Sequence, residues 1–292
     1  ACARGVVPGH EAVGVVRKVG DEVEGFAPGD RVIVPFTVSC GICDRCRAGL
    51  SSRCRESRLF GWGDPSGDPA PLHGAQAEAM RVPLADGTLV AVPETVSDAS
   101  ALLLADNFPT GWHAVARSDH TDGSLAIIGL GAVGLCAIAA AGSRGLTRIV
   151  GIDPIPQRRE VAESLGAIGV APEDVDETFD AIVESAGPPS AQVLAATIAE
   201  PGATISLISV QTAQHFAIDA VTAYDKNLTI RTGRAPVRSL LDDLLPRALA
   251  GEIRVPSDVV ITHPDRPLAD GPELYRSFAD RTILKATFRP GI

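Results

Sequence analysis

Hydrophobic and polar residues follow two different patterns along the 292 residues of the chain. In the first third, short apolar runs are interrupted by glycine, proline and aspartate, as in VGVVRKVG (13–20), DRVIVP (30–35) and LVAVP (89–93). Apolar runs of this length between turn-forming residues are typical of strands. The first third is therefore predicted to be an all-β region.

The middle of the chain shows the second pattern, in which apolar runs alternate with helical stretches. The runs are LAIIG (125–129), RIVGID (148–153), FDAIVESAG (179–187), ATISLISV (203–210) and NLTIRTG (227–233). Strands that alternate with helices predict a parallel, doubly wound sheet. The last run is expected to supply its final strand.

Composition narrows the class of protein. The chain is 45% hydrophobic and 21% charged, which is typical of a folded globular protein. Its formal charge of −10 argues against nucleic acid or an anionic membrane as a partner. Residues 125–142 carry no charge, but their glycines and strand-then-helix pattern favour a buried α/β core over a membrane span. Because no export signal opens the sequence, we expect a cytoplasmic protein.

Four of the six cysteines lie within fifteen residues, in CGICDRCRAGLSSRC. Disulfides would suit a small secreted scaffold, and a redox CxxC motif would need only two cysteines. Four thiolates instead satisfy the tetrahedral coordination of Zn²⁺ and leave no position open for substrate. The predicted ligands of this structural zinc are Cys40, Cys43, Cys46 and Cys54. Interleaved arginines would offset the negative charge of the site; they are Arg45, Arg47 and Arg53.

A glycine-rich turn joins the strand at 125–129 to a helical stretch and carries the pattern Gly129-x-Gly131-x-x-Gly134. Its glycines would serve a tight turn, close approach of a pyrophosphate, and packing of helix on strand. The amino end of the helix would add amide donors for the phosphates. The pattern therefore predicts a dinucleotide site, although a glycine turn without a cofactor is the alternative.

The residue at the end of the next strand bears on the choice of nucleotide. Asp153 would accept hydrogen bonds from the ribose hydroxyls and repel a 2′-phosphate, which favours NAD over NADP. Arg158 and Arg159 follow it and keep NADP open. The predicted nucleotide-binding residues are Gly129, Gly131, Ala132, Val133, Gly134, Asp153 and Arg158.

Two further motifs carry candidate metal ligands. PGHEAVGVV contains His10 and Glu11, which in isolation would be an ordinary surface pair. LLLADNFPTGWHA contains Asp106, which could equally cap a helix that starts at Pro109–Thr110.

With the cysteine loop and the glycine turn, these motifs resemble the zinc-containing medium-chain alcohol dehydrogenases, in order and in approximate spacing. The branch that the chain resembles most includes formaldehyde and threonine dehydrogenases. The resemblance implies a GroES-like catalytic domain at 1–107 and 235–292 and a Rossmann nucleotide domain at 108–234. Substrate and nicotinamide would meet in a cleft between the two domains.

The resemblance also implies an active site and an assembly. His10 and Asp106 would bind a second, catalytic zinc, with Glu11 beside it as a neighbour or exchangeable ligand. Such an ion has an open position and acts as a Lewis acid on an alcohol oxygen. Thr110 would lie near the nicotinamide carboxamide. The substrate would be a small alcohol or aldehyde, and the protein would be a homodimer or homotetramer.

The chain departs from the family at its start. Relatives carry another zinc-ligating cysteine some twenty residues before the histidine, whereas residue 1 lies nine positions before His10, and Cys2 does not match the spacing. Either residues that precede residue 1 are not included here, or the catalytic zinc has been lost. In the second case the chain would be an NAD(P)-linked enzyme without catalytic zinc, or a non-catalytic nucleotide-binding protein.

Overall fold

The computed structural model describes residues 5–62, 72–118 and 123–291. The chain divides into two compact units. The first comprises Ala1–Pro109, Pro236–Gly251 and Ser257–Ile292, and the second comprises Thr110–Ala235 and Glu252–Pro256.

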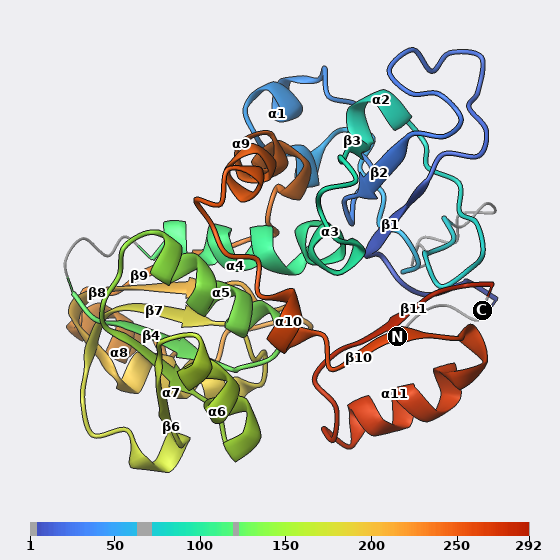
Figure 1. The fold of residues 1–292 in the computed structure, drawn as a ribbon. Coiled ribbons are helices and arrows are strands. Elements are labelled where there is room, and N and C mark those ends of the chain that lie inside the picture. Colours follow the sequence, from blue (N-terminus) through green and yellow to red (C-terminus); the bar gives the residue numbers. More distant parts are fainter. Residues whose placement is uncertain (1–4, 63–71, 119–122, 292) are drawn as a thin grey trace. The chain divides into compact units, whose positions relative to one another are not determined.

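The second unit contains a six-stranded sheet in which all neighbouring strands run parallel (Figure 1). Its order is β6-β5-β4-β7-β8-β9. The strands are β4 (Leu125–Ile128), β5 (Ile149–Ile152), β6 (Ile168–Val170), β7 (Phe179–Glu184), β8 (Ala199–Leu207) and β9 (Thr229–Thr232). This arrangement confirms the doubly wound α/β prediction, with β9 at one edge. β6 was not among the predicted strands: its three residues lie in the short run AIGVA (167–171), with a glycine at the centre, and are exposed or half-buried.

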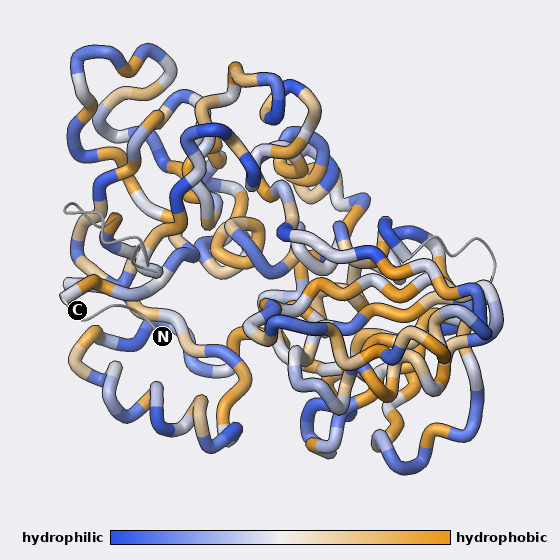
Figure 2. Tube along the Cα trace, turned by 180° about the vertical axis from the view of Figure 1, so that it is seen from behind, coloured by the Kyte–Doolittle hydropathy of each residue, from blue (hydrophilic) through white to orange (hydrophobic). Residues whose placement is uncertain are grey.

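Helices follow the strands of this sheet, as the crossover connections of a parallel sheet require. They are α5 (Ala132–Ser143), α6 (Pro156–Ser164), the 3₁₀ turn η2 (Pro172–Asp174), α7 (Pro189–Thr197) and α8 (Ala220–Asp225). The uncharged stretch 125–142 forms β4 and most of α5, and its side chains are largely buried. Figure 2 shows the strands of this unit as a mostly hydrophobic band. Among the described residues, no helix is both long and apolar enough to cross a membrane.

One helix, α4 (Asn107–Ala116), contains the boundary between the two units. It begins at Asn107, so the expected start at Pro109–Thr110 is wrong by two to three residues. Pro109 lies in the first turn, where a missing N–H costs no intrahelical hydrogen bond.

The first unit contains the predicted strands, but they are short. β1 (Ala12–Val15), β2 (Arg31–Val34) and β3 (Val90–Ala91) form an antiparallel sheet in that order. β10 (His263–Arg266) and β11 (Ala286–Phe288) form a separate parallel pair. The core beside the antiparallel sheet is built from Val32, Val34, Val38, Phe60, Leu72 and Leu89.

Helices and turns complete the first unit, so it is less purely β than predicted. They are α1 (Asp44–Arg47), η1 (Ser51–Arg53), α2 (Ala85–Thr88), α3 (Asp98–Leu104), α9 (Val237–Leu249), α10 (Ser257–Val260), η3 (Leu268–Asp270) and α11 (Gly271–Ala279). Ser97 caps α3 by accepting a hydrogen bond from the backbone N–H of Ser100. The last of the α3 residues are buried leucines, and Asp106 follows them at the junction with α4.

Candidate functional site

The four-cysteine loop brings its sulfur atoms into one cluster. One sulfur from each of Cys40, Cys43, Cys46 and Cys54 lies within 4.8 Å of the others. None of these thiols forms a disulfide. Four sulfurs at this separation match the donor set of a closed, tetrahedral zinc site. The chemistry and the spacing of these residues therefore fit Zn²⁺.

Backbone amides stabilise the sulfur cluster. The N–H of Cys40 donates to Cys54 Sγ over 3.2 Å, and the N–H of Cys43 donates to Cys40 Sγ over 3.3 Å. Hydrogen bonds from the backbone at Arg55 and Cys46 lower the pKa of Cys43 to about 6, whereas burial raises the pKa of Cys46 to about 12. The donors around Cys43 therefore favour its thiolate, the form that binds metal, whereas burial favours the neutral thiol at Cys46.

The cysteine loop is also tied to its surroundings by arginine and serine. Arg55, rather than one of the three predicted arginines, forms a bidentate ion pair with Asp44, with N···O distances of 2.7 and 2.8 Å. The backbone N–H of Ser239 in α9 donates to Ser51 Oγ over 3.2 Å. The loop is thus held by α9, from the part of the chain that returns to the first unit.

His10 is placed by a close approach of two backbone segments. Carbonyl oxygens of residues 7–9 accept hydrogen bonds from the N–H groups of residues 74–76, over 2.8 to 3.0 Å. A Cβ atom on Gly74 would lie 2.1 Å from the carbonyl oxygen of Gly9, so only glycine fits there. Gly9 itself has φ +94°, a conformation that favours glycine. These constraints fix the backbone immediately before His10.

The structure brings His10 and Asp106 together although 96 positions separate them in the sequence. His10 Nε2 lies 3.3 Å from Asp106 Oδ2, and the two side chains are 36% and 15% exposed. Burial lowers the pKa of His10, but the hydrogen bond and charge of Asp106 outweigh it and the net pKa is raised above 6.5. The His10 ring also contacts Phe36 edge-on, with ring centroids 6.2 Å apart.

Glu11 completes a second group of metal-type donors. One donor atom from each of His10, Glu11 and Asp106 lies within 4.8 Å of the others. Lys285 Nζ lies 2.5 Å from Glu11 Oε2, and Asn107 Nδ2 donates to Glu11 Oε1 over 3.4 Å. Neither Lys285 nor Asn107 was predicted to belong to this site. The only available signal was a lone lysine within the apolar run TILKATF.

The second group also fits Zn²⁺, in the manner of a site with an open position. An imidazole nitrogen and carboxylate oxygens are ordinary zinc ligands, and a catalytic ion takes three of them. The 3.3 Å between His10 Nε2 and Asp106 Oδ2 is a separation that two ligands of one tetrahedral ion can have. Cys2, the remaining candidate from the sequence, lies outside the described residues.

The glycine turn of the second unit has the geometry of a nucleotide cradle. Gly129 has φ +90°, and a Cβ atom there would lie 2.6 Å from Ala186 Cβ. A Cβ atom on Gly134 would lie 1.9 Å from the carbonyl oxygen of Gly129. Gly131, at the N-cap of α5, has no atom within 4 Å of such a Cβ. The first and third glycines are therefore required by packing, while the second leaves open space that fits a pyrophosphate.

Asp153 follows β5 and reaches back to this turn. It is 4% exposed. Its Oδ2 accepts from the backbone N–H of Leu130 over 2.8 Å, and Arg158 Nη1 lies 3.7 Å from the same oxygen. Arg159 Nη1 donates to the Asp153 carbonyl over 2.8 Å. Asp153 thus helps to shape the glycine turn, a role that the sequence did not reveal.

A buried hydrogen-bond network lies beside the glycine turn, at the ends of β4 and β7. Glu184, fully buried at the end of β7, accepts from the N–H groups of Ala186 and Gly187 and from the hydroxyl of Ser209. Ser185 Oγ donates to the carbonyl of Gly129 over 2.8 Å. Thr110, the residue expected near the carboxamide, is buried in α4. The ends of β4 and β7 are therefore held together beside the turn.

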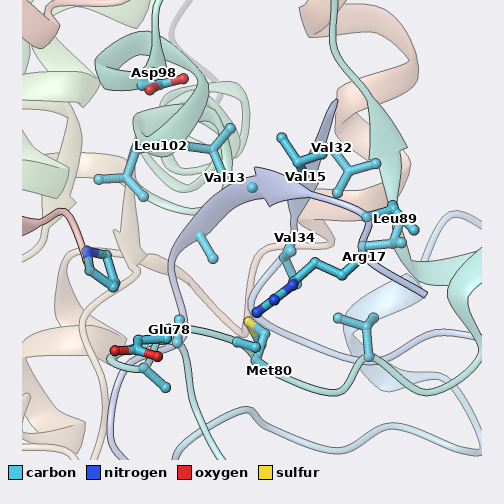
Figure 3. Close-up of a pocket in the computed structure, with 18 of the residues that line it drawn as sticks. Val13, Val15, Arg17, Val32, Val34, Glu78, Met80, Leu89, Asp98 and Leu102 are labelled. Atoms are coloured by element: carbon cyan, nitrogen blue, oxygen red, sulfur yellow. The ribbon is translucent and has the colours of Figure 1, made fainter. Parts of the chain in front are cut away.

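A cavity of about 820 Å³ lies beside the antiparallel sheet of the first unit. Figure 3 shows the valines of β1 and β2 that line it, together with Met80, Leu89 and Leu102. Glu11 contributes to the lining, whereas His10 and Asp106 do not. The cavity is thus adjacent to the candidate metal site but is not the metal site itself.

The second unit combines a parallel doubly wound sheet with a glycine cradle, and the first unit contains one closed and one open group of zinc-type donors. Together these features are typical of metal-dependent, nucleotide-linked oxidoreductases. Comparison with known families agrees with this class. Residues 2–94 match the alcohol dehydrogenase GroES-like domain, and residues 132–239 match the zinc-binding dehydrogenase domain.

Individual relatives also belong to the alcohol dehydrogenases. A zinc-type alcohol dehydrogenase B of Aspergillus flavus is 34% identical over 98% of this chain and 69% of its own length. A probable zinc-binding alcohol dehydrogenase of Mycobacterium tuberculosis is 33% identical over 91% of this chain and 70% of its own. The solved structure of an alcohol dehydrogenase from Thermus sp. ATN1 matches with a TM-score of 0.88 and 32% identity, over 99% of this chain and 86% of that chain.

The chain belongs to the zinc-containing medium-chain alcohol dehydrogenase family and is a zinc-dependent oxidoreductase. The predicted family and fold class are confirmed. Assignment to the formaldehyde and threonine dehydrogenase-like branch stays a prediction.

Proposed function

We propose that this enzyme transfers hydride between a small alcohol or aldehyde and NAD, with a catalytic zinc held by His10 and Asp106. The observation that carries the proposal is the proximity of these two side chains, 3.3 Å apart although 96 positions separate them in the sequence. When bound, zinc polarises the substrate oxygen while NAD⁺ accepts hydride from carbon, so that an alcohol gives a carbonyl compound, NADH and a proton.

The residues of the first unit have distinct roles in this proposal. His10 and Asp106 bind the ion and leave it an open position. Glu11 adds negative charge beside them. The cysteine loop holds a separate zinc on four sulfurs and takes no part in the chemistry, because a closed site has no position for substrate.

In the second unit, the glycine turn and the amino end of α5 would bind the pyrophosphate. Gly131 supports this role, since nothing lies within 4 Å of the position that its Cβ would occupy. The carboxylate of Asp153 favours ribose hydroxyls over a 2′-phosphate, which supports NAD. Arg158 lies 3.7 Å from the Asp153 carboxylate, which partly neutralises its positive charge and weakens the case for NADP, whereas Arg159 donates to the backbone carbonyl of Asp153.

The experiment is an alcohol and aldehyde panel assayed with NAD and with NADP. We expect NAD-linked turnover, with kcat/KM at least about tenfold higher for NAD than for NADP. A chelator should remove the activity and added Zn²⁺ should restore it. Full activity after complete removal of zinc would contradict the proposal.

We also propose a homodimer or homotetramer, by resemblance to the family, and a cytoplasmic location. A zinc site of four cysteines needs them reduced, which supports a reducing compartment. Light scattering on the purified chain measures the oligomeric state, and a monomeric mass would contradict that part of the proposal.

A further inference from the structure

The carboxylate of Glu11 is held by two side chains from distant parts of the first unit. Lys285 Nζ lies 2.5 Å from Glu11 Oε2, and the side chains of Lys285 and Glu11 are 13% and 21% exposed. Asn107 Nδ2 donates to the other oxygen, Oε1, over 3.4 Å. Both oxygens of this carboxylate therefore face hydrogen-bond donors.

Asn107 has no other evident reason to be polar. It is 4% exposed, and its Oδ1 atom has no hydrogen-bond partner among the residues that the structure describes. Its orientation is fixed by chemistry, because only the NH₂ group can donate to the acceptor-only Glu11 carboxylate. A buried carbonyl without a partner is destabilising, so an apolar side chain of the same size would suit the packing better. What asparagine adds at this position is the hydrogen bond to Glu11.

Lys285 is anchored through its backbone. Its carbonyl oxygen accepts hydrogen bonds from the N–H groups of Thr262 and His263, over 3.0 and 3.1 Å. Its own N–H donates to Thr262 Oγ1 over 3.3 Å. The ammonium group of Lys285 thus reaches Glu11 from a backbone segment that these hydrogen bonds hold in place immediately before β11.

Glu11 is close enough to be a metal ligand, since one of its oxygens lies within 4.8 Å of the donor atoms of His10 and Asp106. A carboxylate that binds an ammonium and an amide is a weaker metal ligand, because those donors compete for the same lone pairs. We propose that Lys285 and Asn107 are positioning residues that hold Glu11 away from the metal, and thereby keep a coordination position free for substrate. This inference rests on the proposed function.

The test uses the full chain, with zinc kept in the cysteine loop and Co²⁺ titrated into the second site. The visible absorption of Co²⁺ reports its coordination number. In Lys285→Met, we expect about tenfold tighter Co²⁺ binding, a spectrum of higher coordination number, and a lower kcat with little change in the KM for NAD. Lys285→Arg keeps the charge and should resemble the wild type. Adding Glu11→Gln to Lys285→Met should reverse the spectral change.

Asn107→Leu provides an independent test that does not disturb an ion pair. We expect an unchanged or higher melting temperature together with a smaller spectral shift in the same direction. Unchanged or weaker Co²⁺ binding in Lys285→Met, at a site that His10→Ala abolishes, would overturn this inference alone. If Lys285→Met does not fold, an unshifted spectrum in Asn107→Leu would overturn it. Co²⁺ binding that is unchanged in His10→Ala would overturn the proposed function and this inference with it.

Discussion

The cysteine loop and the His10–Asp106 site are both groups of metal-binding side chains in the first unit, but they are built in opposite ways. The loop takes four like donors from fifteen consecutive residues and surrounds them with backbone amides. The second site takes unlike donors from positions 96 residues apart and leaves its histidine 36% exposed. A local, closed site suits stability, whereas a long-range, open site suits chemistry.

This difference predicts different consequences when one ligand is removed from each site. The strongest effect should come from His10→Ala. We expect at least a thousandfold loss of kcat/KM, about 4 kcal/mol, because the ion that polarises the substrate is no longer held. The measurement is steady-state turnover with NAD, and the melting temperature should change little. His215→Ala, which changes an exposed histidine of the second unit, is the matched control and should keep wild-type activity. A loss of kcat/KM in the control as large as that in His10→Ala would contradict the assigned role of His10.

The next effect concerns stability. Cys54→Ser removes one of the four sulfurs, and we expect a loss of about 3 kcal/mol and a melting temperature lower by about 6–10 °C. Calorimetry with metal analysis checks this. Cys136→Ala removes a fully buried thiol outside the loop and should retain all the zinc. A Cys54→Ser variant that melts like the wild type would show that the loop does not need its metal.

The same contrast explains what the sequence could predict. The zinc site of the cysteine loop could be predicted directly from the sequence, because its four ligands are close neighbours and their spacing is typical of such a site. The parallel sheet could be predicted from its apolar runs, except for β6, whose short run AIGVA carries a glycine at its centre and whose residues are exposed or half-buried. The pairing of His10 with Asp106 could be inferred only by resemblance. The contacts of Glu11 with Lys285 and Asn107 depend on tertiary folding across as many as 274 positions, and no local pattern encodes them.

The glycine turn allows a similar comparison within the second unit. Gly131→Ala adds a methyl group in open space at φ −75°, which any residue adopts, so the fold should be retained. We expect the KM for NAD to rise at least about tenfold, because the methyl group would occupy the space of the pyrophosphate. Gly134→Ala would clash with the Gly129 carbonyl and should lower the melting temperature. Kinetics and thermal melts together separate the two effects. An unchanged KM in Gly131→Ala would contradict the nucleotide site.

The smallest effect is a dependence on pH. Because the pKa of His10 is raised above 6.5, its imidazole is protonated over a wider acidic range, and a protonated imidazole cannot bind metal. Affinity for the second zinc should therefore fall as the pH falls through the raised pKa, by about tenfold per unit of pH below it. Zinc titrations across this range check the direction. Binding that strengthens on acidification would be the opposite of what this pair predicts.

The number of zinc ions per folded chain tests the central claim most directly, since that claim is one closed and one open site in the same unit. Native mass spectrometry should find two ions in the wild type, and a single ion in His10→Ala that is retained by the cysteine loop. A wild-type chain that holds one ion, with the same count in His10→Ala, would contradict the account.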